Sequence, residues 1–317
     1  MESKGLDLCS GDYNTIGVKD EFLQEIRRSQ NINQRSLRDE PTHGACTMVR
    51  VSSLRNAGGY YNNVRCQDGY DLWLKLGLHG KYYHLSEPLF NYRIHSFSLS
   101  SNASRILDCR YKIKKRYFDE NCSENCKVYD LIIPIHKNVL NAQFLKKITA
   151  LLKSLEQIRN IRKIRLIASK IDAFSLKEIK ANFSIDVLIR PDDSYRVKLF
   201  DLIAAVVGKE EIVGDYMLVL DPKTKYDFER LVCEAIYTRE IFDLSGLITV
   251  RKDTRKFYEY GVNGMMPRNL SANIYWEGDE LYSAESGIYA FSGNRLFYGN
   301  SDDYLGGRVG KIMVESF

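Results

Sequence analysis

The sequence contains no continuous apolar run of about 18 residues, which is the usual minimum for a transmembrane helix, and its start does not have the form of a signal peptide. Its seven cysteines are an odd number, and their spacing forms no disulfide scaffold. No second pair of ligand-type residues follows Cys122 and Cys126, so a zinc site is not expected. We therefore expect a reducing, cytoplasmic location, with at most peripheral contact to the inner face of the membrane.

A strong charge of either sign is also lacking. Lys and Arg number 46 against 41 Asp and Glu, and the resulting charge of +5 is too small to indicate nucleic-acid binding. The segment "RYKIKKR" (110–116) concentrates basic side chains. It is either a solvated helix face or a contact for a phosphate-bearing ligand or an anionic membrane surface.

The 317 residues suffice for one large domain or two ordinary ones. The chain has no internal repeat, but its composition changes near residue 120. The polar segment "DENCSENCK" (119–127) is followed by the apolar run "VYDLIIPI". We therefore predict two domains, at 1–120 and 128–317, with a polar linker between them.

The second domain has a regular alternation of strand and helix patterns. Continuously apolar strands are expected at 130–135, 163–169, 185–190, 216–221 and 245–250, and amphipathic helices at 141–158, 175–183, 197–208 and 226–238. Strands without polar alternation are typical of sheets that helices cover on both faces. This pattern predicts an α/β fold with a doubly wound, mostly parallel sheet.

The first domain has shorter, mixed elements. Helices are expected at 19–29, 52–57, about 67–77 and 104–118, and strands at 44–50, 81–85 and 89–95. The second of these helices has a serine as its predicted cap and is predicted to end at Gly58 and Gly59.

Residues 43–76, "HGACTMVRVSSLRNAGGYYNNVRCQDGYDLWLKL", are followed after a short gap by "SEPLFNYRIHSFSLS" (86–100). Together these segments resemble the later, acceptor-binding half of a family 2 glycosyltransferase. The resemblance implies a partial GT-A domain. It also implies inverting transfer of a sugar from a nucleotide sugar to a carbohydrate acceptor, in surface-polysaccharide synthesis.

The same resemblance assigns roles to six side chains. Asp68 matches the general base that takes the proton from the acceptor hydroxyl; its alternative role is to cap a helix. Gln67, Asp71 and Trp73 would contact the acceptor, although Asp71 can also hold the helix start and Trp73 can belong to the core. Arg93 and His95 would lie near the donor diphosphate, and His95 would also approach a metal. A strand-end salt bridge and a loop histidine are the alternatives for this last pair.

The family's metal-binding "DxD" motif, on which Mn²⁺ or Mg²⁺ depends, is not found upstream of "HGACTMVR", and only about 43 residues precede this point. We therefore expect this chain alone to be inactive in glycosyl transfer. A separate partner chain would then supply the donor-binding half. This alternative predicts an exposed apolar edge in the first domain.

The region 128–317 resembles, through "YDLIIPI", "GDYMLVLDPKTKYDFERL", "FDLSGLITVRK" and "ESGIYAFSGNRLF", the cytidylyltransferases that activate sialic-type sugars. This implies a nucleotidyltransferase-like fold and, as the alternative function, a CMP-sugar synthetase-like domain. The glycine-rich phosphate loop of that family is replaced by "IPIHKNVLNAQF", in which His136 and Lys137 are the residues that can contact an anion. Asp221 follows an expected strand. We expect degraded or absent catalysis here, with binding of a sugar or a nucleotide as the remaining role.

Overall fold

The structure is a computed structural model. It describes residues 5–28, 39, 41, 44–78, 80–96, 102–135, 140–155, 158, 160–191, 198–208, 214–253, 258–261, 264–267, 281–298 and 305–314. The chain divides into two compact units, described separately here. Unit 1 comprises Met1–Ile113, Val250–Ser283 and Glu315–Phe317, and unit 2 comprises Lys114–Thr249 and Ala284–Val314. The division falls inside a helix, α4 (Ala103–Asn121), slightly before the polar segment expected as a linker.

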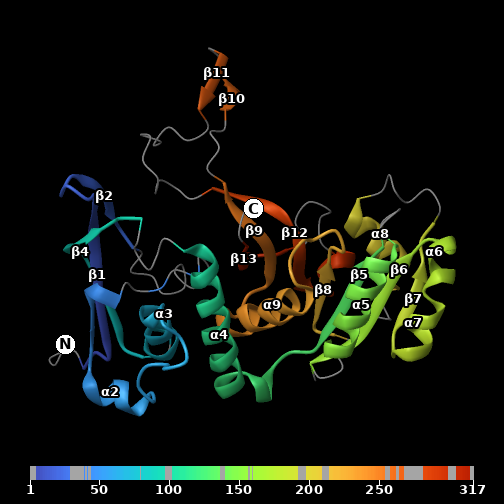
Figure 1. The fold of residues 1–317 in the computed structure, drawn as a ribbon, viewed down its shortest axis with the longest axis horizontal. Helices are drawn as coiled ribbons and strands as arrows, with labels where there is room; N and C mark the ends of the chain where they lie inside the picture. Colours follow the sequence, from blue (N-terminus) through green and yellow to red (C-terminus); the bar gives the residue numbers. More distant parts are fainter. Residues whose placement is uncertain are drawn as a thin grey trace. The chain divides into compact units, whose positions relative to one another are not determined.

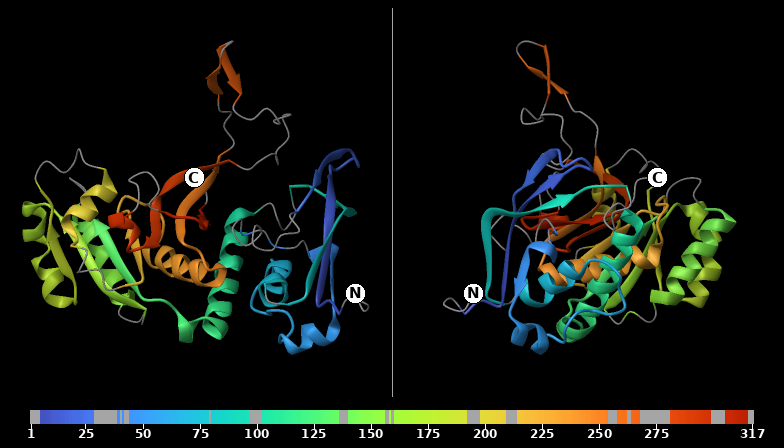
Figure 2. Two further views of the ribbon diagram at one scale, coloured as in Figure 1. Left: turned by 180° about the vertical axis from the view of Figure 1, so that it is seen from behind. Right: turned by 60° about the vertical axis from the view of Figure 1, so that its left-hand side comes forward.

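Unit 1 is built around strand β1 (Leu8–Ile16), as Figures 1 and 2 show. One side of β1 pairs antiparallel with β3 (Thr47–Val49) and β2 (Phe22–Ile26), and the other pairs parallel with β4 (Tyr82–Arg93). A short 3-10 turn (Gly44–Cys46) precedes β3. Helices α2 (Val51–Asn56) and α3 (Asp68–Leu72) follow, and α3 continues as a π-helical turn (Trp73–Gly77).

Three expectations for unit 1 were wrong. The helix expected at 19–29 is a turn followed by β2, because this segment pairs with the end of β1. The strands expected at 81–85 and 89–95 are one strand, β4, which accommodates Pro88 where its register with β1 shifts. No serine side chain caps α2: its cap position is Arg50, and the Ser53 hydroxyl bonds to Asp7 instead.

Unit 2 contains a seven-stranded sheet in the order β13-β9-β12-β8-β5-β6-β7. Its strands are β5 (Tyr129–Pro134), β6 (Ile161–Ala168), β7 (Asp186–Ile189), β8 (Tyr216–Leu220), β9 (Gly246–Asp253), β12 (Leu281–Ser292) and β13 (Val309–Met313). The β5–β6, β6–β7 and β5–β8 pairs are parallel, and β12 runs antiparallel to β8. The predicted mixed α/β fold with a largely parallel sheet is thus confirmed.

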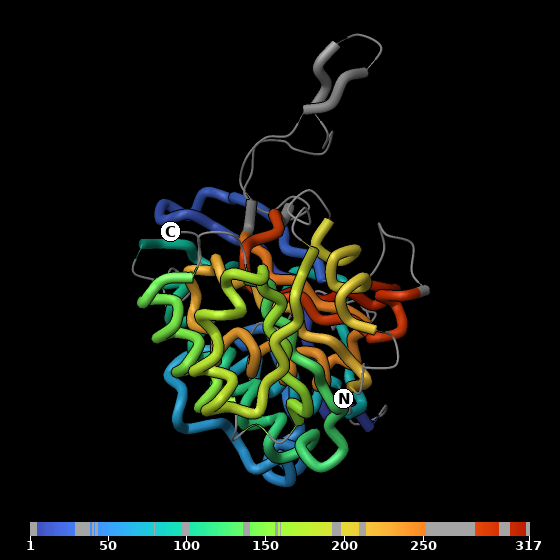
Figure 3. Tube along the Cα trace, turned by 90° about the vertical axis from the view of Figure 1, so that its right-hand side faces the viewer, coloured from blue at the N-terminus to red at the C-terminus, as the bar shows by residue number. Residues whose placement is uncertain are grey.

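The helices of unit 2 alternate with its strands along the chain, as expected. Figure 3 shows the structure with strands β5–β7 toward the reader. They are α5 (Ala142–Leu155), α6 (Lys170–Ser175), α7 (Lys177–Asn182), α8 (Leu199–Val206), α9 (Phe228–Phe242) and α10 (Arg295–Tyr298). The single helix expected at 175–183 is one half of the α6–α7 pair. A separate two-stranded ribbon, which belongs to unit 1, pairs β10 (Tyr258–Gly261) with β11 (Gly264–Pro267).

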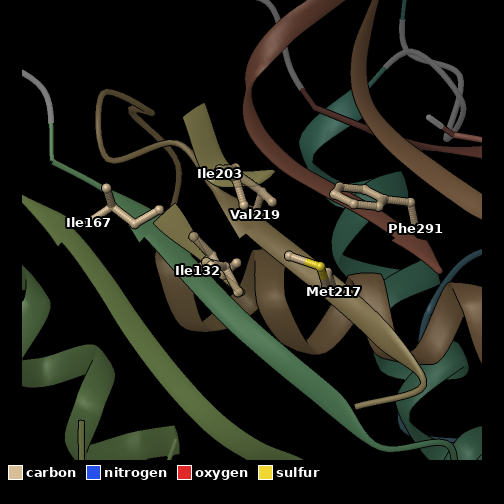
Figure 4. Packing of buried hydrophobic residues seen from close by; sticks show 7 residues of the cluster. Ile132, Ile167, Ile203, Met217, Val219 and Phe291 are labelled. Atoms are coloured by element: carbon tan, nitrogen blue, oxygen red, sulfur yellow. The ribbon is translucent and has the colours of Figure 1, made fainter. Parts of the chain in front are cut away.

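The main core of unit 2 lies between one face of the sheet and α8. Side chains from β5, β6, β8 and β12 meet Ile203 and Val207 there, and Figure 4 shows Ile132, Ile167, Met217, Val219 and Phe291 in this cluster. All six residues of β5 are buried, including those that alternate onto the opposite face. Burial on both faces explains why this strand is continuously apolar except at Asp130.

Candidate functional site

The turn before α3 presents the carboxylate of Asp68. Gln67 adopts the left-handed conformation (φ 67°, ψ 32°), and α3 begins with the next residue. A Cβ on Gly44 would lie 3.2 Å from Asp68 Oδ2, so the glycine leaves room for this carboxylate. Asp68 is exposed, and among the described residues no hydrogen bond or ion pair involves its side chain. An accessible carboxylate of this kind is able to accept a proton from a bound hydroxyl.

Asp71, three residues further, has a structural role. Its side chain is only 3% exposed, and Oδ2 accepts hydrogen bonds from Tyr61 N (3.0 Å) and Lys75 Nζ (2.7 Å). Lys75 also donates to the carbonyl of Gly59 at 2.7 Å. These bonds connect the "GGYY" turn to α3. Asp71 therefore does not belong to the predicted acceptor surface, because its carboxylate is buried inside unit 1.

Trp73 is completely buried, with 0% of its surface exposed, and its ring lies 5.8 Å from that of Tyr70. A Cβ on Gly77 would meet the indole Cδ1 at 2.5 Å, so the following glycine makes space for the ring. A side chain without exposed surface cannot stack on a sugar. Trp73 therefore belongs to the core of unit 1, which was the alternative considered for it.

Gln67 is held by a contact from α4. Its Oε1 accepts a hydrogen bond from Arg110 Nε at 2.9 Å, and the Arg110 guanidinium carbon lies 4.9 Å from the centre of the Tyr70 ring. Tyr70 donates its hydroxyl to Asp39 at 2.7 Å, and Asp39 lies 3.9 Å from Arg110. This cluster fixes the residue that precedes Asp68. The contact between Arg110 and this turn was not predicted from the sequence.

The rest of the basic segment divides its roles. Lys112, Lys115 and Arg116 form exposed ion pairs with acidic residues four positions away on α4, as a solvated helix face would. Lys114, in unit 2, is 2% exposed, donates to Thr238 at 3.1 Å and lies 3.7 Å from Glu234. Three of the five basic residues in 110–116 therefore lie on a solvated helix face, which was one of the two predicted roles of this segment.

Arg93 and His95 lie at the far end of β4. Arg93 donates to the carbonyl of Gly17 at 3.0 Å and to Asp20 at 2.5 Å, which closes the β1–β2 turn. This is the strand-end salt bridge considered as its alternative role. His95 is exposed two residues later. Asp68 is therefore the single member of the six predicted site residues that is exposed on the turn before α3, with Gln67 half-buried beside it.

The separation of Arg93 from Asp68 follows from the register of β1 with its neighbours. Cys46, which ends the turn that begins at Gly44, contacts the carbonyl of Gly11 at 3.1 Å, whereas Arg93 pairs with Ile16. Five residues along a strand span roughly 17 Å. The structure therefore does not bring Arg93 to the side chain of Asp68.

A buried polar network that the sequence did not predict joins β1 to β4. His84 Nε2 lies 2.8 Å from Asp12 Oδ1, and His84 Nδ1 lies 3.0 Å from Ser10 Oγ. The Tyr82 hydroxyl lies within 2.8 Å of Ser10 and 3.2 Å of His84. Ser10, Asp12 and His84 are each at most 2% exposed, so the network joins the strands internally and offers no accessible nucleophile. In the sequence, this network is indicated only by the i, i+2 spacing of Ser10 and Asp12, which places both side chains on one face of β1.

In unit 2, the chain order reverses across the β5–β8 pair. From β5 the chain proceeds outward to β6 and β7, and then returns to β8 on the other side of β5. Open α/β sheets bind ligands at the carboxyl ends of the strands at such a reversal. Asp221 lies directly after β8 at this edge, and its Oδ1 accepts a hydrogen bond from Lys223 N at 2.9 Å. His136 and Lys137, the predicted anion contacts after β5, lie outside the described residues.

The neighbouring strand approaches Asp221 closely. Asp221 N donates to the carbonyl of Gly287 at 2.7 Å. A Cβ on Gly287 would lie 2.5 Å from the hydroxyl of Thr249, which itself bonds to the backbone of Ile288. Glycine at 287 thus allows β9 and β12 to pack closely beside this edge.

A pocket of about 390 Å³ lies at the opposite edge of the same sheet. Its lining includes Lys127, Asp215, Ser292 and Asn294. Asp215, which directly precedes β8, accepts a hydrogen bond from Val128 N at 3.1 Å and so participates in holding β5. The two ends of β8 therefore each carry an aspartate, at opposite edges of the sheet.

No cluster of three or more His, Cys, Asp or Glu side chains in the described part of the chain is arranged to hold a metal ion. His95 alone does not make a site, so no step below depends on Mn²⁺ or Mg²⁺ in unit 1, and the metal implied by the sequence remains a prediction. None of the described helices combines the length and apolar content needed to cross a bilayer.

No protein-family model matches the sequence, and no curated protein matches it. Among solved structures it is similar to 4-diphosphocytidyl-2C-methyl-D-erythritol synthase from Anaerococcus prevotii DSM 20548, with a TM-score of 0.44 and 16% identity. A second structure of an enzyme of this name has a TM-score of 0.41 and 12% identity. Each similarity covers 60% of this chain and 90% of the other.

Proposed function

We propose that unit 2 binds a nucleotide or a nucleotide sugar at the carboxyl edge of β5 and β8. The observation that carries this proposal is the reversal of strand order between these two parallel strands, with Asp221 immediately after β8. Helices α5 and α6 both follow parallel strands that end at this edge.

The chemistry of this edge suits a phosphorylated ribose. A carboxylate has about four acceptor positions, so Asp221 can accept from ribose hydroxyls while retaining its bond from Lys223 N. The start of α5, a helix of 14 residues, supplies amide groups and the positive end of the helix dipole for a phosphate. Since "IPIHKNVLNAQF" lacks the glycines of a phosphate-cradling loop, we propose binding and not nucleotidyl transfer.

Isothermal titration of the full chain with CMP, CTP, UMP and a CMP-sugar, each with Mg²⁺, tests this proposal. Cytidine nucleotides are included because the sequence of this region resembles cytidylyltransferases. Asp221→Asn should weaken binding about tenfold, as expected for a lost charged hydrogen bond. Asp215→Asn, at the other end of the same strand, should leave binding unchanged. If Asp215→Asn alone weakens binding, the ligand occupies the pocket at the opposite edge and the proposal is wrong.

A second candidate function is glycosyl transfer in unit 1, with Asp68 as the base. The observation in its favour is the accessible Asp68 carboxylate, which no described side chain engages. We further propose that a separate donor-binding chain completes this site. Eight of the eleven large hydrophobic side chains exposed among the described residues belong to unit 1: Val18, Phe22, Met48, Val51, Tyr60, Tyr83, Leu89 and Ile94. We propose that the second chain covers part of this apolar surface.

Co-expression with a chain that carries a DxD motif, followed by a glycosyl-transfer assay, tests this candidate. Asp68→Asn should lower kcat at least a hundredfold, the usual contribution of a general base, and should leave association of the two chains intact. Asp108→Asn is the matched control, because Asp108 is a partly exposed aspartate of the same unit that pairs with Lys112. Equal activity of the two variants would eliminate Asp68 as the base.

A further inference from the structure

Two cysteines face each other beside the Asp68 turn. The Sγ atoms of Cys66 and Cys109 lie 2.6 Å apart, although both residues are free thiols in this structure. Cys66 stands two residues before Asp68, and Cys109 belongs to α4. Among the described residues, this is the one pair of cysteines for which a sulfur–sulfur contact is observed. A disulfide bond is about 2.05 Å long, so the sulfurs need to approach by only about 0.5 Å.

The contacts around the pair hold its two sides together without the disulfide. Arg110, which follows Cys109, bonds to the side chain of Gln67, which follows Cys66. Arg105, one turn earlier on α4, donates to the carbonyl of Arg65 at 3.1 Å. Two hydrogen bonds thus flank the thiols and limit their separation. The approach of the sulfurs is therefore a property of the folded unit and not of sequence proximity, since the cysteines are 43 positions apart.

We propose that Cys66 and Cys109 form a site of reversible disulfide formation that fixes the turn before Asp68 to α4. The oxidant is a low-molecular-weight disulfide such as oxidised glutathione. The Cys66 thiolate, on the more exposed side chain, attacks the external disulfide and releases one glutathione thiolate. The Cys109 thiolate then attacks the Cys66 sulfur and releases the second. Two protein thiols and one glutathione disulfide become one protein disulfide and two glutathione thiols.

The electrostatics of the site set the speed of this reaction. Desolvation by burial, reinforced by the hydrogen bond with Cys109, raises the pKa of the Cys66 thiol to about 11. The thiolate is therefore scarce at neutral pH. Its concentration increases about tenfold for each unit by which the pH is raised, as long as the pH stays below this pKa. The dithiol should persist under reducing conditions and oxidise slowly when glutathione disulfide accumulates.

Incubation of the full chain with oxidised glutathione at pH 7, 8 and 9, followed by peptide mapping without reduction, tests the proposal. We expect a cross-linked pair of peptides containing Cys66 and Cys109, an intact mass lower by two hydrogens, and a rate that rises about tenfold per pH unit. Cys122 and Cys126 are the matched control, because burial raises their pKa values to about 11 and about 12. They should not cross-link at a comparable rate.

Cys66→Ser and Cys109→Ser should each abolish the cross-link and leave the remaining cysteine as a mixed disulfide with glutathione or as a thiol. Hydrogen exchange of residues 61–70 provides a second measurement, and it should slow in the oxidised wild-type chain only. Oxidation that yields only mixed disulfides, or a cross-link that forms as fast in urea as in the native chain, would overturn the proposal.

Discussion

Asp130 and Arg165 form an ion pair inside unit 2, and removal of one partner gives the sharpest test of the fold. Both side chains are 0% exposed, and Arg165 Nη1 lies 3.0 Å from Asp130 Oδ2. The variant Arg165→Met keeps most of the buried volume but leaves a carboxylate in the core. Removing one partner of a buried ion pair usually costs roughly 3–5 kcal/mol.

Hydrogen exchange measured by mass spectrometry reports on unit 2 separately from unit 1. The β5 and β6 peptides of Arg165→Met should lose about 4 kcal/mol of protection at pH 7, while the β1 and β4 peptides remain unchanged. The double variant Asp130→Leu with Arg165→Met should recover most of the loss, because no charge is left unpaired. A loss below about 1 kcal/mol would refute the reasoning that the two buried charges depend on each other.

The remaining predictions concern unit 1. Trp73→Ala should cost about 3–5 kcal/mol in urea unfolding, since it removes a fully buried indole, and a near-neutral result would contradict the core assignment. Lys75→Met should destabilise by about 3–5 kcal/mol by stranding the buried Asp71 carboxylate, and Lys81→Met on the surface is its control. Hydrogen bonds from the Ser53 hydroxyl and the Lys81 amide lower the pKa of Asp7 in the folded state. Asp7 therefore contributes stability above its unfolded pKa, and this contribution is lost as the pH falls through the folded pKa. The melting temperature of Asp7→Asn should vary less with pH in this acidic range than that of the wild type. Oxidation of Cys66 and Cys109 should raise the unfolding free energy of unit 1 by about 4 kcal/mol through closure of the long loop.

The sequence predicted the core of unit 2 well because its signals are local and redundant. Each strand is a short apolar run, and each longer helix has a continuous stripe, as in α5, where Phe144, Ile148, Leu151, Leu152 and Leu155 are all buried. Unit 1 lacks such redundancy. The segment 22–26 has both a helical and a strand-compatible pattern, and its pairing with β1 decides between them. The continuity of β4 through Pro88 likewise depends on a register shift that pairing with β1 determines.

The candidate site was predictable only in part, because its contacts join residues distant in sequence. Gln67 and Arg110 are 43 positions apart, and Ser10 and His84 are 74 apart. A sequence motif identifies residues that occur together in a family, but it does not distinguish those that face solvent from those that support them. Trp73 and Asp71 belong to the same short motif as Asp68 and are nevertheless buried.

Asp68 and Asp71 demonstrate how the fold separates two identical side chains three residues apart. Both stand in the first turn of α3, where the helix dipole favours an acidic residue, so local electrostatics does not distinguish them. The distinction comes from Lys75, one turn later, and from the backbone of the "GGYY" turn, which together satisfy Asp71 and draw it inside. No such partner is described for Asp68, which faces Gly44, a residue without a side chain. The glycine at position 44 leaves the space in which this carboxylate lies. Gly44→Ala, which brings a methyl group to about 3.2 Å from this carboxylate, should therefore reduce any activity that depends on Asp68 while leaving the Asp71–Lys75 contacts in place.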